Sequence, residues 1–204
     1  MSYTHYRKLL NIKNFYKIRY YILITINNKL SVRELDKRIK SKEYERLSVD
    51  ARNKIINKDN LNIKELVPEP IVIKGNDIDK ENITEKALHK LIVENISDFM
   101  EQLGNGYSFI KSEYPIKIGN YYNYIDLLLF NYIYNCFVVI ELKITTLKSE
   151  HIGQVEKYVN YIDKNIKTIN QNKTIGIILV KKNNKFIVEY STNENIIARS
   201  YEIV

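Results

Sequence analysis

The amino-acid sequence predicts an α/β fold with a mixed central sheet, preceded by a small helical segment. From residue 84 onwards, the apolar pattern runs in the order helix, three strands, helix, and two or more strands. Before residue 48, apolar residues recur at helical spacing, and a stretch rich in proline, asparagine and aspartate follows. We therefore expect a helical part followed by a part that contains the sheet.

The helical part is expected to contain three helices and to end in a connection. We place the helices over residues 2–10, 13–29 and 31–47. Ser31 and Glu34 form a capping-box pattern at the start of the third helix. Prolines, a glycine and a run of Asn and Asp argue against long regular elements over 48–83. The chain thus divides into a basic helical segment over 1–60, a linker over 61–79 and a domain over 80–204.

The domain over 80–204 has clear element boundaries. A helix over 84–103 begins near Thr84 and ends at the run Gly104-Asn105-Gly106. The remaining pattern predicts strands over 107–118, 122–130 and 136–144, a helix over 149–166, strands over 174–181 and 186–190, and an extended run near 199–203. Helices that alternate with strands in this way are typical of an α/β domain.

The positive charge is concentrated at the N-terminus. Residues 1–60 hold 15 lysines and arginines against 6 aspartates and glutamates, whereas the rest of the chain holds 17 against 18. The formal net charge of +8 therefore comes from the helical segment. Such an excess favours a polyanionic partner, for which nucleic acid is the commonest candidate. A lysine-rich, solvated helical surface is the alternative.

Membrane and secreted classes are not favoured by the sequence. The longest apolar stretch, over 125–142, is interrupted by Asn131 and Asn135, so it falls short of the roughly 18 apolar residues of a membrane helix. The N-terminus is basic but lacks the continuous apolar region of a signal peptide. The single Cys136 cannot form an internal disulfide. We expect a cytoplasmic protein with no membrane partner.

Charged residues inside the apolar runs at 122–130 and 136–144 indicate a functional site. The two runs predict an antiparallel hairpin, and if Asn131 pairs with Cys136, Asp126 lies opposite Glu141. Lys143 shares a strand face with Glu141 because side chains alternate. Adjacent carboxylates repel, so a divalent cation such as Mg²⁺ suits the space between them, and a lysine there can orient a water. A structural cluster of acids and a lysine is the alternative.

The two helices that flank the hairpin carry further polar residues. Glu85 points into the apolar stripe of the helix over 84–103, where it would be a third acidic group unless fraying leaves it exposed. Gln154 and Tyr158 are i,i+4 neighbours that could contact a phosphate or position a water. The alternative is a boundary tyrosine beside a surface glutamine. Lys148 is suited to a phosphate or to an ordinary surface. The three histidines lack metal-ligand spacing, and no nucleophilic serine or cysteine elbow is present.

These residues together resemble the PD-(D/E)xK nuclease superfamily. The pattern consists of ID at 125–126, ELK at 141–143, the helical Glu85 and Q-x-x-x-Y at 154–158, with Ile125 in the place of the motif's proline. The αβββαβ order is similar to the superfamily's restriction-endonuclease-like core. More closely, the segments EKALHKLIVENISDFMEQLGNGYSFI, YIDLLLFNYIYNCFVVIELK and EHIGQVEKY resemble the YhcG family over about residues 80–204. The stretches YTHYRKLLNIK and LSVRELDKRIKSKEYERL resemble the end of that family's N-terminal helical region.

The resemblance implies a DNA endonuclease that depends on Mg²⁺ or Mn²⁺. It implies metal ligation by Asp126, Glu141, the Leu142 carbonyl and Glu85, service of the attacking water by Lys143, and substrate contacts from Gln154, Tyr158 and Lys148. The expected partners are duplex or branched DNA, with a homodimer or a partner protein in addition. The alternative is a truncated or catalytically inactive nuclease-fold module that binds nucleic acid or protein.

Overall fold

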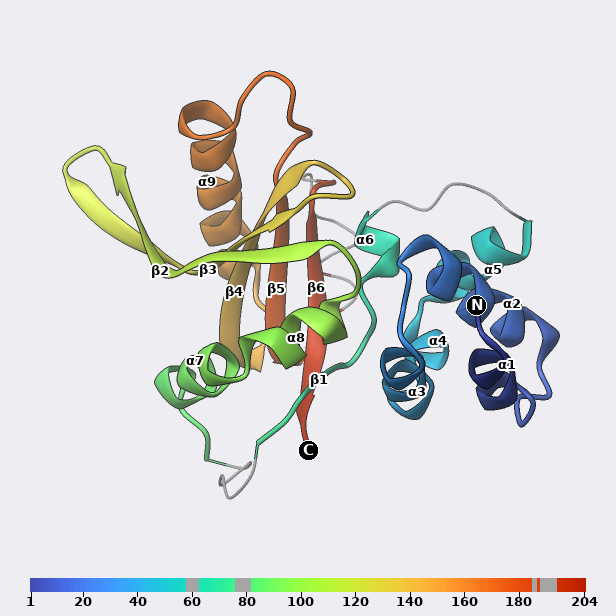
Figure 1. The fold of residues 1–204 in the computed structure, drawn as a ribbon. Helices are drawn as coiled ribbons and strands as arrows, with labels where there is room; N and C mark the ends of the chain where they lie inside the picture. Colours follow the sequence, from blue (N-terminus) through green and yellow to red (C-terminus); the bar gives the residue numbers. More distant parts are fainter. Residues whose placement is uncertain (58–62, 76–81, 185–186, 188–193) are drawn as a thin grey trace. The chain divides into compact units, whose positions relative to one another are not determined.

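The computed structural model describes residues 1–57, 63–75, 82–184, 187 and 194–204. Within these ranges the chain forms two compact units, Met1–Pro68 and Glu69–Val204 (Figure 1). Among the described residues, no helix combines the length and hydropathy that a membrane crossing requires.

The N-terminal unit is helical, as expected. Its helices are α1 (Tyr3–Leu9), α2 (Phe15–Asn27), α3 (Val32–Lys40), α4 (Glu43–Arg46), α5 (Val49–Asn57) and α6 (Ile63–Leu66). The capping box at the start of α3 is confirmed, because the Glu34 N–H donates to Ser31 Oγ and the Ser31 N–H donates to the Glu34 carboxylate. The single helix predicted over 31–47 is wrong. Lys42 adopts a left-handed conformation with φ of 53°, which separates α3 from α4.

A buried carboxylate ties three helices of this unit together. Glu43, at the start of α4, accepts the Tyr20 hydroxyl of α2 at 2.6 Å and the Arg38 guanidinium of α3 at 2.9 and 3.1 Å. These bonds compensate for the burial of its charge. Around them lies the apolar core of the unit, formed by Leu9, Tyr20, Tyr21, Leu35, Tyr44, Leu47, Ala51 and Ile55.

The stretch 48–83 contains more regular structure than the sequence suggested. Besides α5 and α6 it holds the strand β1 (Ile71–Ile73), which pairs in parallel with β6 (Ile196–Ile203). The units divide at Pro68–Glu69, so much of the predicted linker over 61–79 belongs to one unit or the other. Three apolar residues behind two prolines form too short a run to be recognised as a strand without their distant partner.

The second unit has the predicted αβββαβ order. Its elements, besides β1 and β6, are α7 (Glu85–Glu94), α8 (Ile96–Leu103), β2 (Tyr107–Ile118), β3 (Tyr121–Asn131), β4 (Cys136–Thr146), α9 (Ser149–Asn165) and β5 (Ile175–Lys182). The helix predicted over 84–103 is two helices, because Asn95 leaves the helical conformation and its side chain donates to the Leu91 carbonyl. The strand predicted over 186–190 falls almost entirely outside the described residues.

The sheet is mixed, as predicted, with the strand order β1-β6-β5-β4-β3-β2. Strands β2, β3 and β4 are antiparallel, and β4, β5, β6 and β1 are parallel. Helix α9 connects β4 to β5 and packs its apolar side on the sheet through Val155, Tyr158, Val159 and Ile162. Helix α7 adjoins β4, and α8 adjoins β1 and β2 (Figure 1). The middle of β3, at Asp126, and the second half of β4 thus lie near the first turns of α7 and α9.

Candidate active site

The candidate site lies where strands β3 and β4 stop pairing. Their register runs from Asn131 opposite Cys136 to Leu127 opposite Ile140, as the sequence predicted. One step further, Asp126 Oδ2 accepts the N–H of Leu142 at 2.7 Å. The carboxylate therefore takes the position of a strand acceptor and is held between the two strands.

The carboxyl group of Glu141 is almost entirely buried. The residue is 2% exposed, and its Oε1 accepts Lys143 Nζ and Gln154 Nε2, each at 2.8 Å. Its Oε2 is also buried and has no hydrogen-bond partner among the described residues. An unsatisfied buried carboxylate oxygen is costly in free energy, and it is chemically suited to accept a cation or a hydrogen-bond donor.

The protonation of the two carboxyl groups is altered by their surroundings. Burial, and then the charge of Asp126, raise the pKa of Glu141 to about 7. Burial also raises the pKa of Asp126, although the Leu142 N–H and the charge of Lys143 act in the opposite direction. Two carboxyl groups with raised pKa values at one place need added positive charge to ionise fully at neutral pH.

The Lys143 ammonium supplies part of that charge. Burial alone would lower the pKa of Lys143, but the hydrogen bond to Glu141 and the charges of Glu141, Glu85 and Asp126 raise it above its usual value. Lys143 is therefore an ammonium at neutral pH. It stabilises one oxygen of Glu141 and leaves the other without a partner.

Helix α9 contributes Gln154 and Tyr158 to the site. Gln154 Nε2 lies 2.8 Å from Glu141 Oε1 and 3.0 Å from the Tyr158 hydroxyl oxygen, and Tyr158 is buried. The alternative of a boundary tyrosine beside a surface glutamine is therefore wrong. The pair orients the Glu141 carboxylate, and contact with a substrate stays a prediction.

Glu85 and Lys148 lie at the periphery of the cluster. Glu85, in the first turn of α7, places Oε2 3.9 Å from Lys143 Nζ, and its side chain is 47% exposed. In the described part of the chain, no three His, Cys, Asp or Glu side chains gather closely enough to hold an ion. The described geometry therefore links Glu85 to the site through Lys143. The Lys148 side chain is 61% exposed and lies 3.5 Å from Glu150 Oε1.

Two histidines lie beside the site. His89 Nε2 donates to the backbone carbonyl of Asp126 at 3.1 Å, which joins α7 to the middle of β3. His151 is buried, accepts the Lys148 N–H at 3.2 Å, and has a pKa lowered by burial and by the charge of Lys143. The i,i+4 spacing of Glu85 and His89 is the sequence signal that places both on one helix face.

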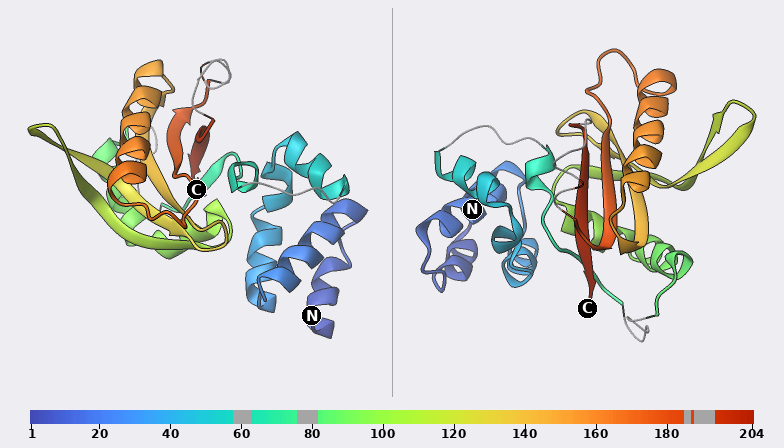
Figure 2. Two further views of the ribbon diagram at one scale, coloured as in Figure 1. Left: turned by 90° about the horizontal axis from the view of Figure 1, so that it is seen from above. Right: turned by 180° about the vertical axis from the view of Figure 1, so that it is seen from behind.

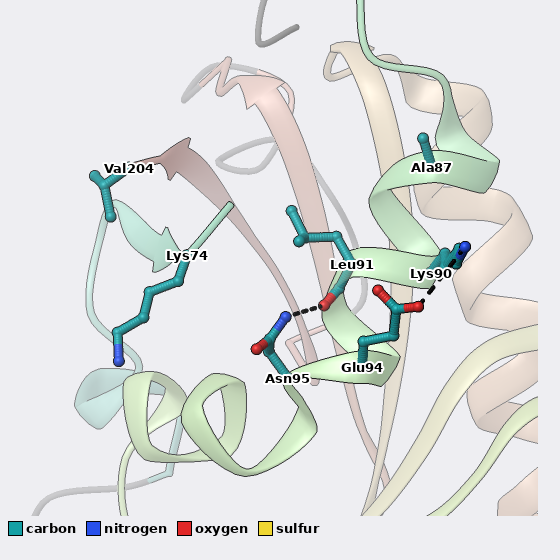
Figure 3. Close-up of a pocket in the computed structure, with 7 residues that line it drawn as sticks. All are labelled: Lys74, Ala87, Lys90, Leu91, Glu94, Asn95 and Val204. Atoms are coloured by element: carbon teal, nitrogen blue, oxygen red, sulfur yellow. Dashed lines mark hydrogen bonds and ion pairs between the residues drawn. The ribbon is translucent and has the colours of Figure 1, made fainter. Parts of the chain in front are cut away.

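A separate hollow on the second unit does not include the cluster. It has a volume of about 500 Å³ and is lined by Lys74, Ala87, Lys90, Leu91, Glu94, Asn95 and Val204 (Figure 3). Its two lysines are paired with acids, since Lys74 Nζ lies 2.6 Å from Asp98 Oδ2 and Lys90 Nζ lies 3.7 Å from Glu94 Oε1. Both ammonium groups are therefore already paired with carboxylates, which does not favour an anion-binding site in this hollow.

Comparisons with known proteins relate the chain to nucleases. Over 180 residues the chain is 25% identical to "Putative nuclease YhcG" of Escherichia coli (strain K12). The matched region covers 85% of this chain and 48% of the relative. The chain thus spans about half the length of that relative. Similar solved structures are a repair endonuclease from Pyrococcus abyssi and an EndoMS–dsDNA complex. Each has 19% identity, a TM-score of 0.41 and covers 64% of this chain, with 49% and 48% of the respective structures covered.

The assignment to a family rests on a sequence model of that family, which matches more than half of the chain. The model describes the YhcG PDDEXK nuclease domain and matches residues 64–204. That range includes β1 and begins earlier than the predicted start at residue 80. The chain belongs to the YhcG PDDEXK nuclease family.

Proposed function

We propose that this protein is a divalent-metal-dependent endonuclease that hydrolyses phosphodiester bonds in DNA. The observation that carries the proposal is the buried, unpartnered Oε2 of Glu141, which lies beside Asp126 and Lys143 in a chain of a nuclease family. A carboxylate kept in this condition destabilises the fold, and such residues concentrate at functional sites.

The donor set suits a hard divalent cation. Asp126 and Glu141 supply carboxylate oxygens, and Mg²⁺ binds through one or two carboxylates together with waters and a substrate phosphate. The N–H and C=O of a strand residue point to the same side, so the Leu142 carbonyl faces the same gap as its N–H, which Asp126 accepts. We assign these three residues to Mg²⁺ or Mn²⁺. When bound, the ion supplies Lewis acidity and a water of lowered pKa.

The other residues of the cluster orient the water, the phosphate and the metal-binding carboxylate. Because its pKa is raised, Lys143 is cationic, so it stabilises negative charge that develops on the phosphate and holds the attacking water by hydrogen bonding. Glu85 acts on the position of Lys143 through their 3.9 Å contact. Gln154, itself held by Tyr158, fixes the Glu141 carboxylate through Oε1, which leaves the unpartnered Oε2 available to a cation.

Metal-dependent cleavage tests this proposal. We expect the wild-type chain to cut duplex, branched or single-stranded DNA with Mg²⁺ or Mn²⁺, and not with EDTA. Asp126→Asn keeps an oxygen for the Leu142 N–H but removes the charge, so we expect a loss of about 10³-fold. Equal cleavage by both proteins would refute the site. DNA binding by the wild type without any cleavage would instead support an inactive binding module.

The N-terminal unit has a basic hollow suited to the DNA backbone. Its volume is about 890 Å³, and it is lined by Thr4, Arg7, Lys8, Asn11, Ile12, Lys13, Asn14, Lys17, Asp36, Ile39, Lys40, Tyr44, Glu45 and Arg52. Lys8 and Lys40 share Asp36, and Lys17 pairs with Glu45. Three further cations, Arg7, Lys13 and Arg52, have no ion pair with a described residue. This excess favours phosphate contacts, and a partner protein or a second copy of the chain is the alternative occupant.

Neutralising the unpaired cations is expected to change the salt dependence of DNA binding. If Arg7, Lys13 and Arg52 each contact a phosphate, changing all three to Gln lowers the slope of log K against log salt by about 2–3 for duplex DNA. The slope is measured by fluorescence anisotropy in EDTA between low and physiological salt.

A matched control removes the same charge elsewhere. Lys157, Lys164 and Lys173 are exposed in the second unit, and their combined change to Gln should leave the slope nearly unaltered. If the variant with Arg7, Lys13 and Arg52 changed to Gln retains the wild-type slope, the basic hollow does not contact the DNA backbone.

A further inference from the structure

The β2–β3 hairpin extends beyond the rest of the sheet as an arm. Its outer part, residues 115–124, pairs only within the hairpin, because the pairing of β3 with β4 is confined to Leu127–Asn131. In every view the arm leaves the body of the second unit (Figures 1 and 2). An isolated two-stranded hairpin is only marginally stable in water, so stability alone does not explain the length of the arm.

The two faces of the arm differ. On one face, Ile116 and Ile125 are buried in the core beside α9 and anchor the base of the arm. On the other face, Lys117 lies opposite Tyr122, and Pro115 lies opposite Tyr124. Pro115, Lys117, Tyr122 and Tyr124 together form the arm face.

The arm face presents aromatic rings to solvent. Tyr122 is 64% and Tyr124 is 57% exposed, and Lys117 Nζ lies 5.8 Å from the Tyr122 ring centroid. Two neighbouring exposed rings with a cation beside them are typical of surfaces that stack on nucleic-acid bases. With Lys117 as its one cation, the arm face carries too little positive charge to bind a continuous run of duplex phosphates.

The arm face leads towards the cluster along strand β3. Tyr124 precedes Asp126 by two residues and Tyr122 by four, which corresponds to about 7 and 14 Å at the usual rise of a strand. A strand of DNA whose phosphate lies at Asp126 therefore has its adjacent nucleotides within reach of the two rings.

We propose that Tyr122 and Tyr124 stack on unpaired bases next to the bond that is cut, with Lys117 at an adjoining phosphate. Resting on the proposed nuclease function, this names the substrate class as DNA with unpaired bases, such as a flap, a bubble or a branch. In a regular duplex the base faces are covered by their neighbours, so the rings have nothing to stack on. Single-stranded and splayed segments expose these faces.

Binding measured without cleavage tests the proposal. The full chain is titrated in EDTA against single-stranded, bubble and duplex DNAs that carry 2-aminopurine. The variants are Tyr122→Leu/Tyr124→Leu, which removes the rings, and Tyr122→Phe/Tyr124→Phe, which keeps them. We expect the leucine variant to bind single-stranded and bubble DNA on the order of 10- to 100-fold more weakly, with the 2-aminopurine quenching lost. Duplex binding should change less than about twofold, and the phenylalanine variant should behave as the wild type.

A matched control and an assembly measurement make the outcome decisive. Tyr132, an exposed tyrosine of the β3–β4 turn, is changed to Leu and should leave binding unaltered. Equal weakening on duplex and unpaired DNA, or no weakening at all, would overturn the proposal. So would a wild-type dimer that the leucine variant dissociates in sedimentation, because a second copy would then cover the arm face. These titrations are made in EDTA and measure binding without cleavage. Their outcome therefore does not depend on whether the protein cuts DNA.

Discussion

Glu141→Gln is expected to reduce metal-dependent cleavage by about 10³-fold or more while leaving the metal-free fold at least as stable as the wild type. The glutamine can still accept Lys143 and Gln154 through its oxygen, but it carries no charge for the ion. It also removes a buried carboxylate whose Oε2 lacks a hydrogen-bond partner among the described residues. Activity and stability should therefore change in opposite directions.

Two measurements separate these effects. Calorimetric titration with Mn²⁺ should show loss of binding in Glu141→Gln, and thermal unfolding in EDTA should show an unchanged or higher midpoint. Glu150→Gln is the control, since this carboxylate is exposed at the start of α9 and lies outside the cluster. A destabilised variant that still binds Mn²⁺ would contradict the assignment of Glu141.

The pH dependence of the metal-free protein follows from the raised pKa of Glu141. The folded state keeps its proton up to about pH 7, whereas the unfolded chain loses it near pH 4.5. The free energy of unfolding therefore falls as pH rises through this window, by on the order of 1–3 kcal/mol. Glu141→Gln should flatten that fall. Part of it should remain, because the pKa of Asp126 is raised as well.

Lys143→Met is expected to reduce cleavage by about 10²- to 10³-fold with much less effect on metal binding. Methionine keeps much of the chain length and loses the ammonium that stabilises charge at the phosphate. Because Lys143 donates to Glu141 at 2.8 Å, its removal also raises the pKa of Glu141 further. The activity of the variant should therefore recover partly at higher pH.

Single-turnover cleavage and Mn²⁺ titration measure the two effects of Lys143→Met. Lys157→Met is the matched control, because that side chain is exposed on α9 and lies outside the cluster. We expect the control to change cleavage by less than about threefold. If Lys143→Met abolishes metal binding, Lys143 acts through the metal site rather than on the reacting phosphate.

Local patterns in the sequence predicted the hairpin well. The pairing of Asn131 with Cys136 follows from the short connection between two apolar runs, and it fixed the neighbourhood of Asp126 and Glu141. Strand β1 was missed because its stability depends on pairing with residues about 130 positions away. The break at Lys42 was missed because no glycine or proline marks it.

The polar contacts of the site were predicted only in part. Helical spacing placed Gln154 and Tyr158 side by side, but that Gln154 donates to Glu141 depends on how α9 packs on the sheet. His89 was left out because it was considered as a metal ligand, whereas it binds a backbone carbonyl. Periodicity identifies which residues share a face of an element, and tertiary packing decides which atoms they meet.

The hydrogen bond from Leu142 to Asp126 has a practical consequence for capturing a substrate complex. At this position the proposed metal ligand is also part of the scaffold, since the carboxylate replaces a main-chain acceptor. A truncating change to alanine would abolish chemistry and loosen the strands at the same time. Asparagine retains an oxygen for the Leu142 N–H, so Asp126→Asn is the appropriate inactive form for trapping uncut DNA on an undistorted protein.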